Sequence, residues 1–349
     1  MHRATVEKFG RMDQRGTAWT RPGNLVGNGP FTLTEWKPNA RIVVAKNPHY
    51  WGAAHNGLER VMFFPNESPD VEERAFRAGQ IHVTYNVPTS KIAGYREREP
   101  AKLRLDPLLS TFFIYFNASK PPLDNPKLRR ALSLAIDRES ISRHVLNGSR
   151  PPATTLVPDN CAGYTSSTRV SFDYAAARQL LTDAGYPGGQ GLPVFEVLVR
   201  NDDIQPKITE AIQAMWQREL GVRITIAPIE QKTLFQNQQT LNYTISFGGW
   251  NGDFVDPVTF LDLFVTGGGN NWSGWSNPTY DQFIAEAART RDSARRFEIL
   301  QRAEALLLEA SPIAPVFHNA RTYLIHPAVK NWESALLGIH RYELIKLEN

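Results

Sequence analysis

The stretch that decides the fold is residues 194–226, VFEVLVRNDDIQPKITEAIQAMWQRELGVRITI. Residues 194–199 are rich in branched and aromatic side chains, which is typical of a strand. Pro206 begins the following helix, and Gly221 ends it just before a second strand at residues 222–226. One apolar stripe on this helix predicts a core face rather than a ligand site: Ile208, Ala211, Ile212, Met215 and Trp216. This order of elements indicates two parallel strands joined by a right-handed crossover, and therefore an α/β domain.

The N-terminal part of the chain shows further strand and helix patterns. Residues 31–36 and 41–45 alternate apolar and polar side chains on either side of a Pro-Asn-Ala turn, which predicts a hairpin. Residues 58–64 predict a third strand, and a short helix over residues 70–78 leads to a strand at residues 81–85.

The rest of the chain continues the mixture of strands and helices. Residues 108–116 are strongly strand-like, and a helix with Pro126 at its first position follows. Residues 148–171 are rich in Pro, Thr, Ser, Asn and Gly, which indicates a long irregular loop with a functional or covering role. Residues 313–317 and 322–325 predict two more strands.

Composition limits the classes of function. With 349 residues, 42% of them hydrophobic, the chain can form one large domain or two ordinary ones with real cores. The 39 Lys and Arg are interspersed with 35 Asp and Glu, so we expect no nucleic-acid partner. Cys161 is the single cysteine and cannot form an internal disulfide. The sequence has no apolar run of membrane-spanning length, and residues 1–10 lack the hydrophobic segment of a secretion signal.

The sequence has few features of an enzyme. It contains no Gly-x-Ser-x-Gly motif, and Cys161 lies in a loop without a nearby histidine to activate it. None of the eight histidines forms a helical His-Glu-x-x-His pair, and Gly267-Gly268-Gly269 lacks the Lys and Ser/Thr of a phosphate-binding loop. We therefore expect a protein that is not an enzyme and has no metal site and no cofactor.

The candidate binding segment is residues 247–257, FGGWNGDFVDP, which lies between a strand-like segment and an apolar helical one. Its three glycines within five residues leave room for the backbone of a ligand, and Trp250 and Phe254 offer flat apolar walls. The Asp253 carboxylate can hold a cationic group, while an exposed strand edge can pair with an extended peptide. The alternative is a glycine-rich turn in which Asp253 only caps the next helix, and the residues alone leave both interpretations open.

Several segments occur in the order of a known family. The chain resembles the peptide-binding proteins of bacterial ABC importers, the oligopeptide/dipeptide-binding family (extracellular solute-binding protein family 5). The segments that carry the resemblance cover nearly the whole chain: residues 28–33, 47–51, 116–117 with 120–132, 135–138 and 249–253.

The resemblance implies an α/β fold of the periplasmic-binding-protein type II class, in which two lobes joined by a hinge close on a ligand. Residues 1–109 would be part of the first lobe, residues 110–318 the second lobe with the ligand cleft, and residues 319–349 a return segment to the first lobe. Family members have a signal peptide, a first part of the split lobe and an extra subdomain before the region where this chain begins. We therefore expect an N-terminally truncated chain that lacks these parts.

The resemblance also implies a function. It indicates a non-catalytic, monomeric, periplasmic receptor that captures oligopeptides and delivers them to the membrane permease subunits of an ABC transporter. In oligopeptide-binding members, the aspartate that matches Asp253 pairs with the peptide's α-amino group. The main chain at Gly249 and Asn251 would pair with the peptide backbone, and Trp250 and Phe254 would form the walls of the site.

Two departures from one well-known oligopeptide-binding member bear on the site. Leu146, Gln205 and Phe247 stand where that member has cations for the ligand's carboxyl terminus, so the site would fix one end of a peptide and leave the other end open. Phe247 is kept among the ligand-binding positions for this reason. Ser110 and Asn251 stand where that member has a disulfide, and both cysteines are absent together.

Other classes remain as alternatives. The chain could be the ligand-sensing domain of a transcriptional regulator, which would be cytoplasmic if Met1 is the true start. It could also be a related receptor for a metal chelate, a sugar or an opine-like compound, or a hydrolase that captures its substrate between lobes. A last alternative is that the truncated product does not fold stably, because apolar faces meant for absent segments are exposed.

Overall fold

The computed structural model describes residues 2–66, 68–159 and 161–348, and the chain divides into two compact units. Unit 1 consists of the residues up to Asp106 together with those from Arg321 onward, and unit 2 is Pro107–Ala320. The sequence places the two crossings after residues 109 and 318, whereas the units divide after residues 106 and 320. The division into lobes stays a prediction.

Unit 2 is built on a five-stranded sheet in the order β6-β5-β7-β4-β8. The strands are β4 (Leu103–Phe116, which begins in unit 1), β5 (Phe195–Arg200), β6 (Ile224–Ile229), β7 (Ile245–Asn251) and β8 (Ile313–Leu324, which ends in unit 1). The predicted crossover is confirmed, because β5 and β6 pair in parallel and the helix α7 (Gln205–Leu220) connects them. Strand β4 pairs antiparallel with β7 along the whole length of β7.

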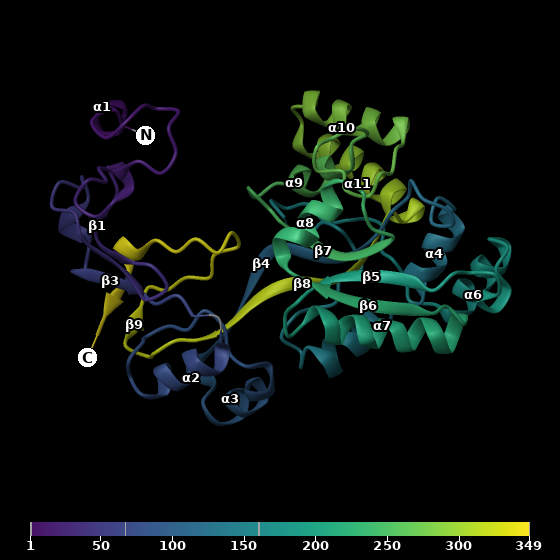
Figure 1. Ribbon diagram of the computed structural model, residues 1–349, viewed down its shortest axis with the longest axis horizontal. Helices are drawn as coiled ribbons and strands as arrows, with labels where there is room; N and C mark the ends of the chain where they lie inside the picture. Colours follow the sequence, from purple (N-terminus) through teal and green to yellow (C-terminus); the bar gives the residue numbers. More distant parts are fainter. Residues whose placement is uncertain (1, 67, 160, 349) are drawn as a thin grey trace. The chain divides into compact units, whose positions relative to one another are not determined.

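Helices cover both faces of this sheet. Figure 1 shows α7 on one face and the helices α9, α10 and α11 on the other. The longer helices of unit 2 have these bounds: α4 (Pro126–Leu134), α6 (Tyr174–Asp183), α8 (Gln231–Gln239), α10 (Pro278–Arg289) and α11 (Ser293–Ala310). The shorter ones are α5 (Arg138–Ser140), continued by a π-helix over Ile141–Val145, and α9 (Val258–Leu261), continued by a 3-10 helix over Asp262–Phe264. The unit is therefore a three-layer α/β/α sandwich.

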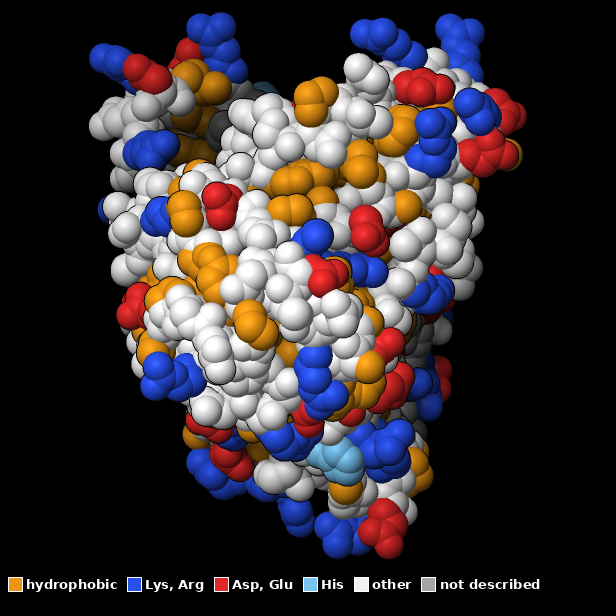
Figure 2. Space-filling model, turned by 90° about the vertical axis from the view of Figure 1, so that its right-hand side faces the viewer, with side chains coloured by type: hydrophobic (Ala, Val, Ile, Leu, Met, Phe, Trp, Pro, Cys, Tyr) orange, Lys and Arg blue, Asp and Glu red, His pale blue; other side chains and the backbone are white. Residues whose placement is uncertain are grey.

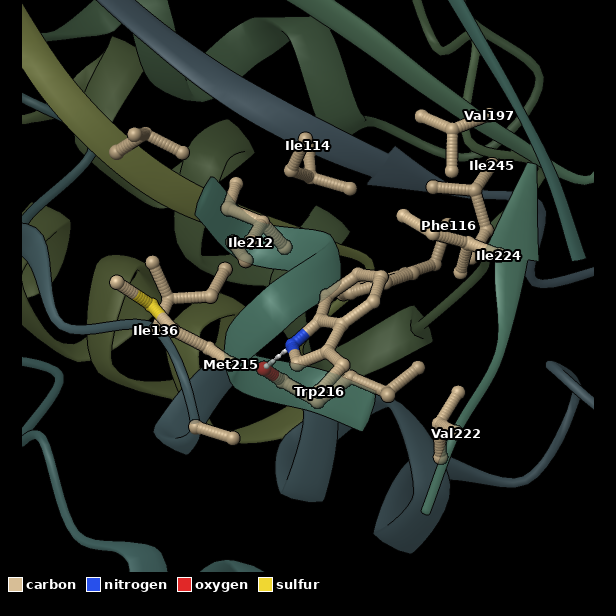
Figure 3. Close-up of a cluster of buried hydrophobic side chains, with 14 of the residues drawn as sticks. Ile114, Phe116, Ile136, Val197, Ile212, Met215, Trp216, Val222, Ile224 and Ile245 are labelled. Atoms are coloured by element: carbon tan, nitrogen blue, oxygen red, sulfur yellow. Dashed lines mark hydrogen bonds between the residues drawn. The ribbon is translucent and has the colours of Figure 1, made fainter. Parts of the chain in front are cut away.

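The core on the α7 side confirms the predicted apolar stripe. Trp216 is fully buried, and its indole N–H donates to the main-chain oxygen of Leu132 at 2.9 Å. Figure 3 shows this ring and Met215 on α7 among side chains from the strands: Ile114, Phe116, Val197, Ile224 and Ile245. A second cluster, with Phe113, Tyr115 and residues of α9, α10 and α11, fills the other side of the sheet. Residues alternating along one strand thus contribute to both cores.

Two buried arginines hold the chain between the sheet and α4. Arg138 is only 3% exposed and donates to the main-chain oxygens of Pro315, Ile136 and Ser133 at 2.6, 2.9 and 3.2 Å. Arg129, equally buried, donates to the main-chain oxygen of Ala310 at 2.8 Å. A guanidinium suits such positions because its fork of donors satisfies several carbonyls at once.

One buried acid of α11 forms hydrogen bonds with the long loop expected at residues 148–171. Glu304 of α11 is fully buried and accepts from the main-chain N–H groups of Leu156 and Val157 at 2.8 and 2.9 Å and from the Tyr164 hydroxyl at 2.6 Å. Loss of hydration raises the pKa of this carboxyl in spite of these bonds. The loop is thus a fixed cover over the α11 side of unit 2.

Unit 1 is smaller and has little core of its own. Its elements include α1 (Arg3–Glu7), β1 (Phe31–Lys37), β2 (Arg41–Lys46), β3 (Arg60–Phe63), α2 (Pro69–Arg77), α3 (Ile92–Arg98), β9 (Val329–Lys330) and β10 (Lys346–Leu347). Strands β1 and β2 form the predicted hairpin, the predicted third strand β3 pairs antiparallel with β2, and β9 pairs with β10. The buried cluster of the unit is Phe76, Val87, Ile92, Tyr95, Leu103 and Leu324.

Much apolar surface of unit 1 is exposed. Most of the large apolar side chains that the described ranges leave exposed belong to this unit, among them Trp36, Trp51, Met62, Tyr85 and Ile339. A hollow of about 830 Å³ also lies within the unit, lined by residues of the 54–57, 331–335 and 339–346 segments.

Three expectations differ from the structure. Residues 81–85 form no strand, since only Val83 makes an isolated bridge, to Ile325. The strands expected at residues 313–317 and 322–325 are one continuous strand, β8. The helix α8 has no counterpart among the predicted elements, because its sequence QKTLFQNQQ buries only Leu234 and Gln238 and therefore lacks an apolar stripe.

The surface charge agrees with the sequence. Figure 2 shows basic and acidic side chains interspersed over one face of the molecule, without a large patch of one sign. Within the ranges that the structure describes, no helix combines the length and the apolar character that crossing a membrane requires. In the same ranges, no group of three or more His, Cys, Asp or Glu is placed to hold a metal ion.

Candidate ligand-binding site

The candidate segment begins on a strand with an open edge. Strand β7 pairs with β4 from Ile245 to Asn251, but with β5 only at Ile245 and Ser246. Beyond Ser246, the β5 side of β7 has no strand partner within the described ranges. A strand edge of this kind carries main-chain donors and acceptors that an extended ligand can use.

The ladder with β4 decides which residues face that edge. The N–H of Gly252 donates to the main-chain oxygen of Leu109, so this pair is hydrogen-bonded. Because hydrogen-bonded and non-bonded pairs alternate in an antiparallel ladder, Trp250 and Gly248 also direct their main chain to β4. Gly249 and Asn251 then direct their N–H and C=O groups to the open edge. These are the two residues whose main chain the resemblance assigns to the ligand.

The structure gives a different reason for glycine at positions 248, 249 and 252 from the one that the sequence suggested. A Cβ at Gly248 would lie 2.6 Å from a ring carbon of Tyr115, and one at Gly249 would lie 2.9 Å from the Phe112 ring. A Cβ at Gly252 would lie 2.6 Å from Leu109. Side chains of β4 occupy this space, so the interpretation that the glycines leave room for a ligand is wrong for their side-chain positions. They allow β7 to pack closely on β4.

Two acids, Asp253 and Asp256, follow the end of β7, and they differ in their partners. Asp256 forms a bidentate ion pair with Arg296, with N–O distances of 2.7 and 2.8 Å, and accepts from the N–H of Val258 at 2.9 Å. Burial raises the pKa of Asp256, but Arg296 outweighs this and the net pKa is lowered. Asp256, rather than Asp253, therefore sits at the start of α9. The helix-capping alternative for Asp253 is wrong.

Asp253 has no such partner. Its side chain is exposed, and its carboxylate makes no hydrogen bond or ion pair with any residue that the structure describes, while its N–H donates to the Thr259 hydroxyl at 3.0 Å. Loss of hydration, and second the charge of Asp253, raise the pKa of the nearby Asp262. Two carboxyls thus lie close together, and neither forms an ion pair with a residue that the structure describes, which is an arrangement that favours a cationic ligand group.

The aromatic candidates fall into different environments. Phe254 is 49% exposed and follows the strand, so it is available to a ligand. Trp250 is half-buried against the α9–α11 cluster, and its indole N–H is buried without a partner within the described ranges. Phe247 is fully buried between Phe112 and Phe317 in the opposite core. Its side chain therefore does not line an open site, contrary to the expectation.

The structure also shows the surroundings of the positions that differ from the well-known oligopeptide-binding member. Leu146, Gln205 and Phe247 are 1%, 5% and 0% exposed, so the three side chains belong to the core of unit 2 and bring no cation to a ligand. Ser110 and Asn251, by contrast, are direct partners in the β4–β7 register. Their pair is a non-hydrogen-bonded one, in which Cα atoms come within about 4.5 Å.

A partly buried histidine beside the site was not singled out from the sequence. His318 of β8 has its Nδ1 2.9 Å from the hydroxyl of Thr111, which is the register partner of Trp250. The Thr111 hydroxyl donates to the main-chain oxygen of Leu156 at 2.7 Å, so His318 must be the donor to Thr111. Its Nε2 lies 3.4 Å from the hydroxyl of Thr155. Burial lowers the pKa of His318 to about 4.

The fold and the site together define a class of protein, which the comparisons with known proteins identify. The chain belongs to the bacterial extracellular solute-binding proteins, family 5, whose middle region it matches over residues 2–272. The fold matches the structure of the murein tripeptide binding protein MppA of Escherichia coli, with a TM-score of 0.86 and 31% identity over 99% of this chain and 68% of that one. The recognised family and the fold class are thereby confirmed.

Two curated relatives show the range of the family. The periplasmic oligopeptide-binding protein OppA of Salmonella typhimurium is 30% identical over 94% of this chain and 60% of its own length. The probable deoxycholate-binding periplasmic protein YgiS of Escherichia coli is 31% identical over 90% of this chain and 60% of its length. The chain therefore spans about 60% of the length of these relatives, which are named as binding proteins rather than enzymes.

Proposed function

We propose that this chain is the ligand-binding portion of a peptide receptor that serves an ABC transporter. An extended peptide adds to the free edge of β7, where Gly249 and Asn251 direct their main-chain groups. Its ammonium lies at Asp253, and Trp250 and Phe254 flank its first side chains. The single observation that carries the proposal is an open strand edge that ends at Asp253, an acid with no ion-pair partner among the described residues.

The proposed location and the proposed transport role rest on the family. The OppA relative is named as periplasmic and oligopeptide-binding, which supports a periplasmic receptor. Capture in a cleft between two lobes, and delivery to membrane permease subunits by a monomeric receptor, are the finer parts of the proposal that the resemblance implies. None of these steps requires a catalytic group.

Calorimetry with matched peptides tests the anchor. We expect a tripeptide with a free amine to bind the chain about 10- to 100-fold more tightly than its N-acetylated form, because a charged hydrogen bond is worth about 1.5–3 kcal/mol. Asp253→Asn should lower the affinity for the free peptide by a similar factor and leave that for the acetylated peptide unchanged. Asp256→Asn is the matched control in the same loop, although it also loses the Arg296 ion pair. Equal binding of the two peptides overturns the anchor.

Amide hydrogen exchange tests the edge without a mutation. In the free chain, the amides of Gly248 and Trp250 are protected by β4, whereas those of Gly249 and Asn251 face the open edge and exchange fast. We expect a bound peptide to slow the second pair and leave the first pair unchanged. Uniform protection along β7, or none, contradicts main-chain pairing at this strand.

A second candidate follows from the relative YgiS, whose name assigns it deoxycholate. Deoxycholate is a carboxylate without an ammonium, so among the site residues the exposed apolar ring of Phe254, rather than Asp253, is the feature that favours it. Deoxycholate should then displace a bound peptide in competition calorimetry. A peptide that binds while deoxycholate at millimolar concentration does not compete favours the first candidate.

A further inference from the structure

One polar side chain occupies the inner end of the open edge of β7. Gln238, next to the last residue of α8, is 0% exposed although it is an amide. Its Nε2 donates to the main-chain oxygen of Phe247 at 3.2 Å and to the hydroxyl of Ser246 at 2.9 Å. Both acceptors belong to β7, so α8 is bonded to this strand through a single side chain.

The side-chain amide of Gln238 lies at the point where the pairing between β5 and β7 ends. The ladder between β5 and β7 ends at the pair Leu198–Ser246. Ser246 continues the bridge, since its hydroxyl donates to the main-chain oxygen of Leu198 at 3.3 Å. The C=O of Phe247 points to the β5 side and lies just beyond the last pair, so it would otherwise be the first free acceptor of the edge. Gln238 takes the place that a further β5 residue would have had.

The orientation of this amide is set by its surroundings. Turning it over would bring its oxygen against the Phe247 carbonyl oxygen, which is an acceptor only. The remaining oxygen, Oε1, is buried and accepts no hydrogen bond within the described ranges. An unpaired buried acceptor is unfavourable, so the two donor contacts are the interactions that hold the amide in place. The position also needs Gly248, because a Cβ there would lie 3.0 Å from Nε2.

We infer that Gln238 is a positioning residue that closes the inner end of the peptide-binding edge, so that β7 pairs with a ligand only through Gly249 and Asn251. This inference rests on the proposed function and deepens it. The ligand class that follows is a peptide with a free amine whose backbone is read only near its N-terminus. The N–H group that would next reach Phe247 meets an acceptor already in use, and the ligand beyond that point is free of main-chain pairing with β7.

An N-methyl scan tests this limit. The probe is the hexapeptide Ala-Ser-Ala-Ser-Ala-Ser and its five derivatives with one methylated peptide nitrogen each, with affinity measured by calorimetry on the whole chain. Methylation removes one N–H donor, so each nitrogen that pairs with β7 should cost about tenfold in affinity. With the unsubstituted protein, methylation should weaken binding at no more than two nitrogens of the hexapeptide, those that pair with Asn251 and Gly249. A third sensitive nitrogen two residues farther along overturns the inference without any mutation.

Two variants of Gln238 should make the main-chain oxygen of Phe247 available to the ligand. Gln238→Met keeps about the same volume and removes the donor, and Gln238→Ala removes the whole side chain. Each should create one additional sensitive nitrogen, two residues beyond the last one, because the Phe247 carbonyl becomes free. Gln239→Met, on the exposed neighbouring position of α8, is the matched control and should keep the original pattern. A cooperative thermal transition verifies that each variant is folded.

The outcomes separate the inference from the proposed function. If the unsubstituted chain binds none of the hexapeptides, or binds all of them equally, pairing at β7 fails and the inference fails with it. If it binds with two sensitive nitrogens and both Gln238 variants keep the same two, the proposed function stands and the role of Gln238 is overturned. A merely structural role would lower all affinities alike and would add no sensitive position.

Discussion

Acidification should destabilise unit 2 through His318. The pKa of this imidazole is lowered to about 4 by burial, whereas an unfolded histidine titrates near about 6.5. The folded state therefore binds this proton less readily than the unfolded state, and stability falls as the pH drops below the unfolded pKa. The difference amounts to about 2 kcal/mol at pH 5 and at most about 3 kcal/mol below pH 4.

The surroundings of the His318 ring make this loss of stability an upper limit. Nδ1 already donates to Thr111 at 2.9 Å, and protonation of Nε2 would allow a bond to the Thr155 hydroxyl, now 3.4 Å away. That new bond would offset part of the cost. Among the charged groups, Asp159 favours the protonated ring and Arg169 opposes it, and these two form an ion pair with each other at 2.8 Å. Burial therefore decides the direction.

The assay is urea unfolding at pH 7.5, 6.0 and 5.0, followed by tryptophan fluorescence, for the unsubstituted chain and for His318→Gln. The variant has an amide that does not titrate, so its stability should fall by about 2 kcal/mol less between pH 7.5 and pH 5.0. His144→Gln, at an exposed position, is the control and should behave like the unsubstituted chain. Equal pH dependence of the chain and His318→Gln refutes the reasoning.

Three further predictions concern the parts that position the site. Arg138→Met should lower the free energy of unfolding by about 3–5 kcal/mol in urea titrations, because it removes a charged donor from three buried carbonyls, of which Ser133 also accepts from the N–H of Ile136, and an effect under 1 kcal/mol would contradict this. Gly248→Ala should cost about 1–3 kcal/mol, since its Cβ meets the fully buried Tyr115 ring at 2.6 Å, and calorimetric melting would show it. Ser110→Cys combined with Asn251→Cys should form a disulfide under mild oxidation, because the two residues face each other in the register, and thiol titration that still finds both groups free would refute the register.

Much of the fold could be predicted from periodic patterns. The β5–α7–β6 unit was predictable because the helix buries most of its apolar stripe, β5 is largely buried, and both strands are rich in branched residues. The helix α8 was not, since it is held by Leu234 and by the polar Gln238, and an apolar period cannot reveal a helix that is anchored through an amide. Residues 81–85 have the composition of a strand, but only Val83 finds a bridging partner.

The candidate site shows the same limit. The sequence places an acid and an exposed strand edge together, and the structure finds Asp253 beside the open end of β7. It could not show that Asp256 takes Arg296 as its partner, because those residues are distant in the chain and meet only through α11. Nor could it show that the glycines accommodate side chains of β4, since a glycine near a neighbouring strand and one near a ligand look alike in sequence.

The short open edge of β7 has a consequence for association between folded proteins. Exposed edges invite pairing with strands of other molecules, and proteins discourage this by keeping such edges short and charged. Here Gln238 occupies one end and the negative charge of Asp253 and Asp262 lies at the other, so only the rungs between them are open. A flexible chain with a cationic end can enter this gap, whereas a long rigid strand of a second folded molecule meets an obstruction at one end and uncompensated charge at the other. In the proposed peptide receptor, the features that would admit a peptide would also protect the chain against aggregation through strand β7.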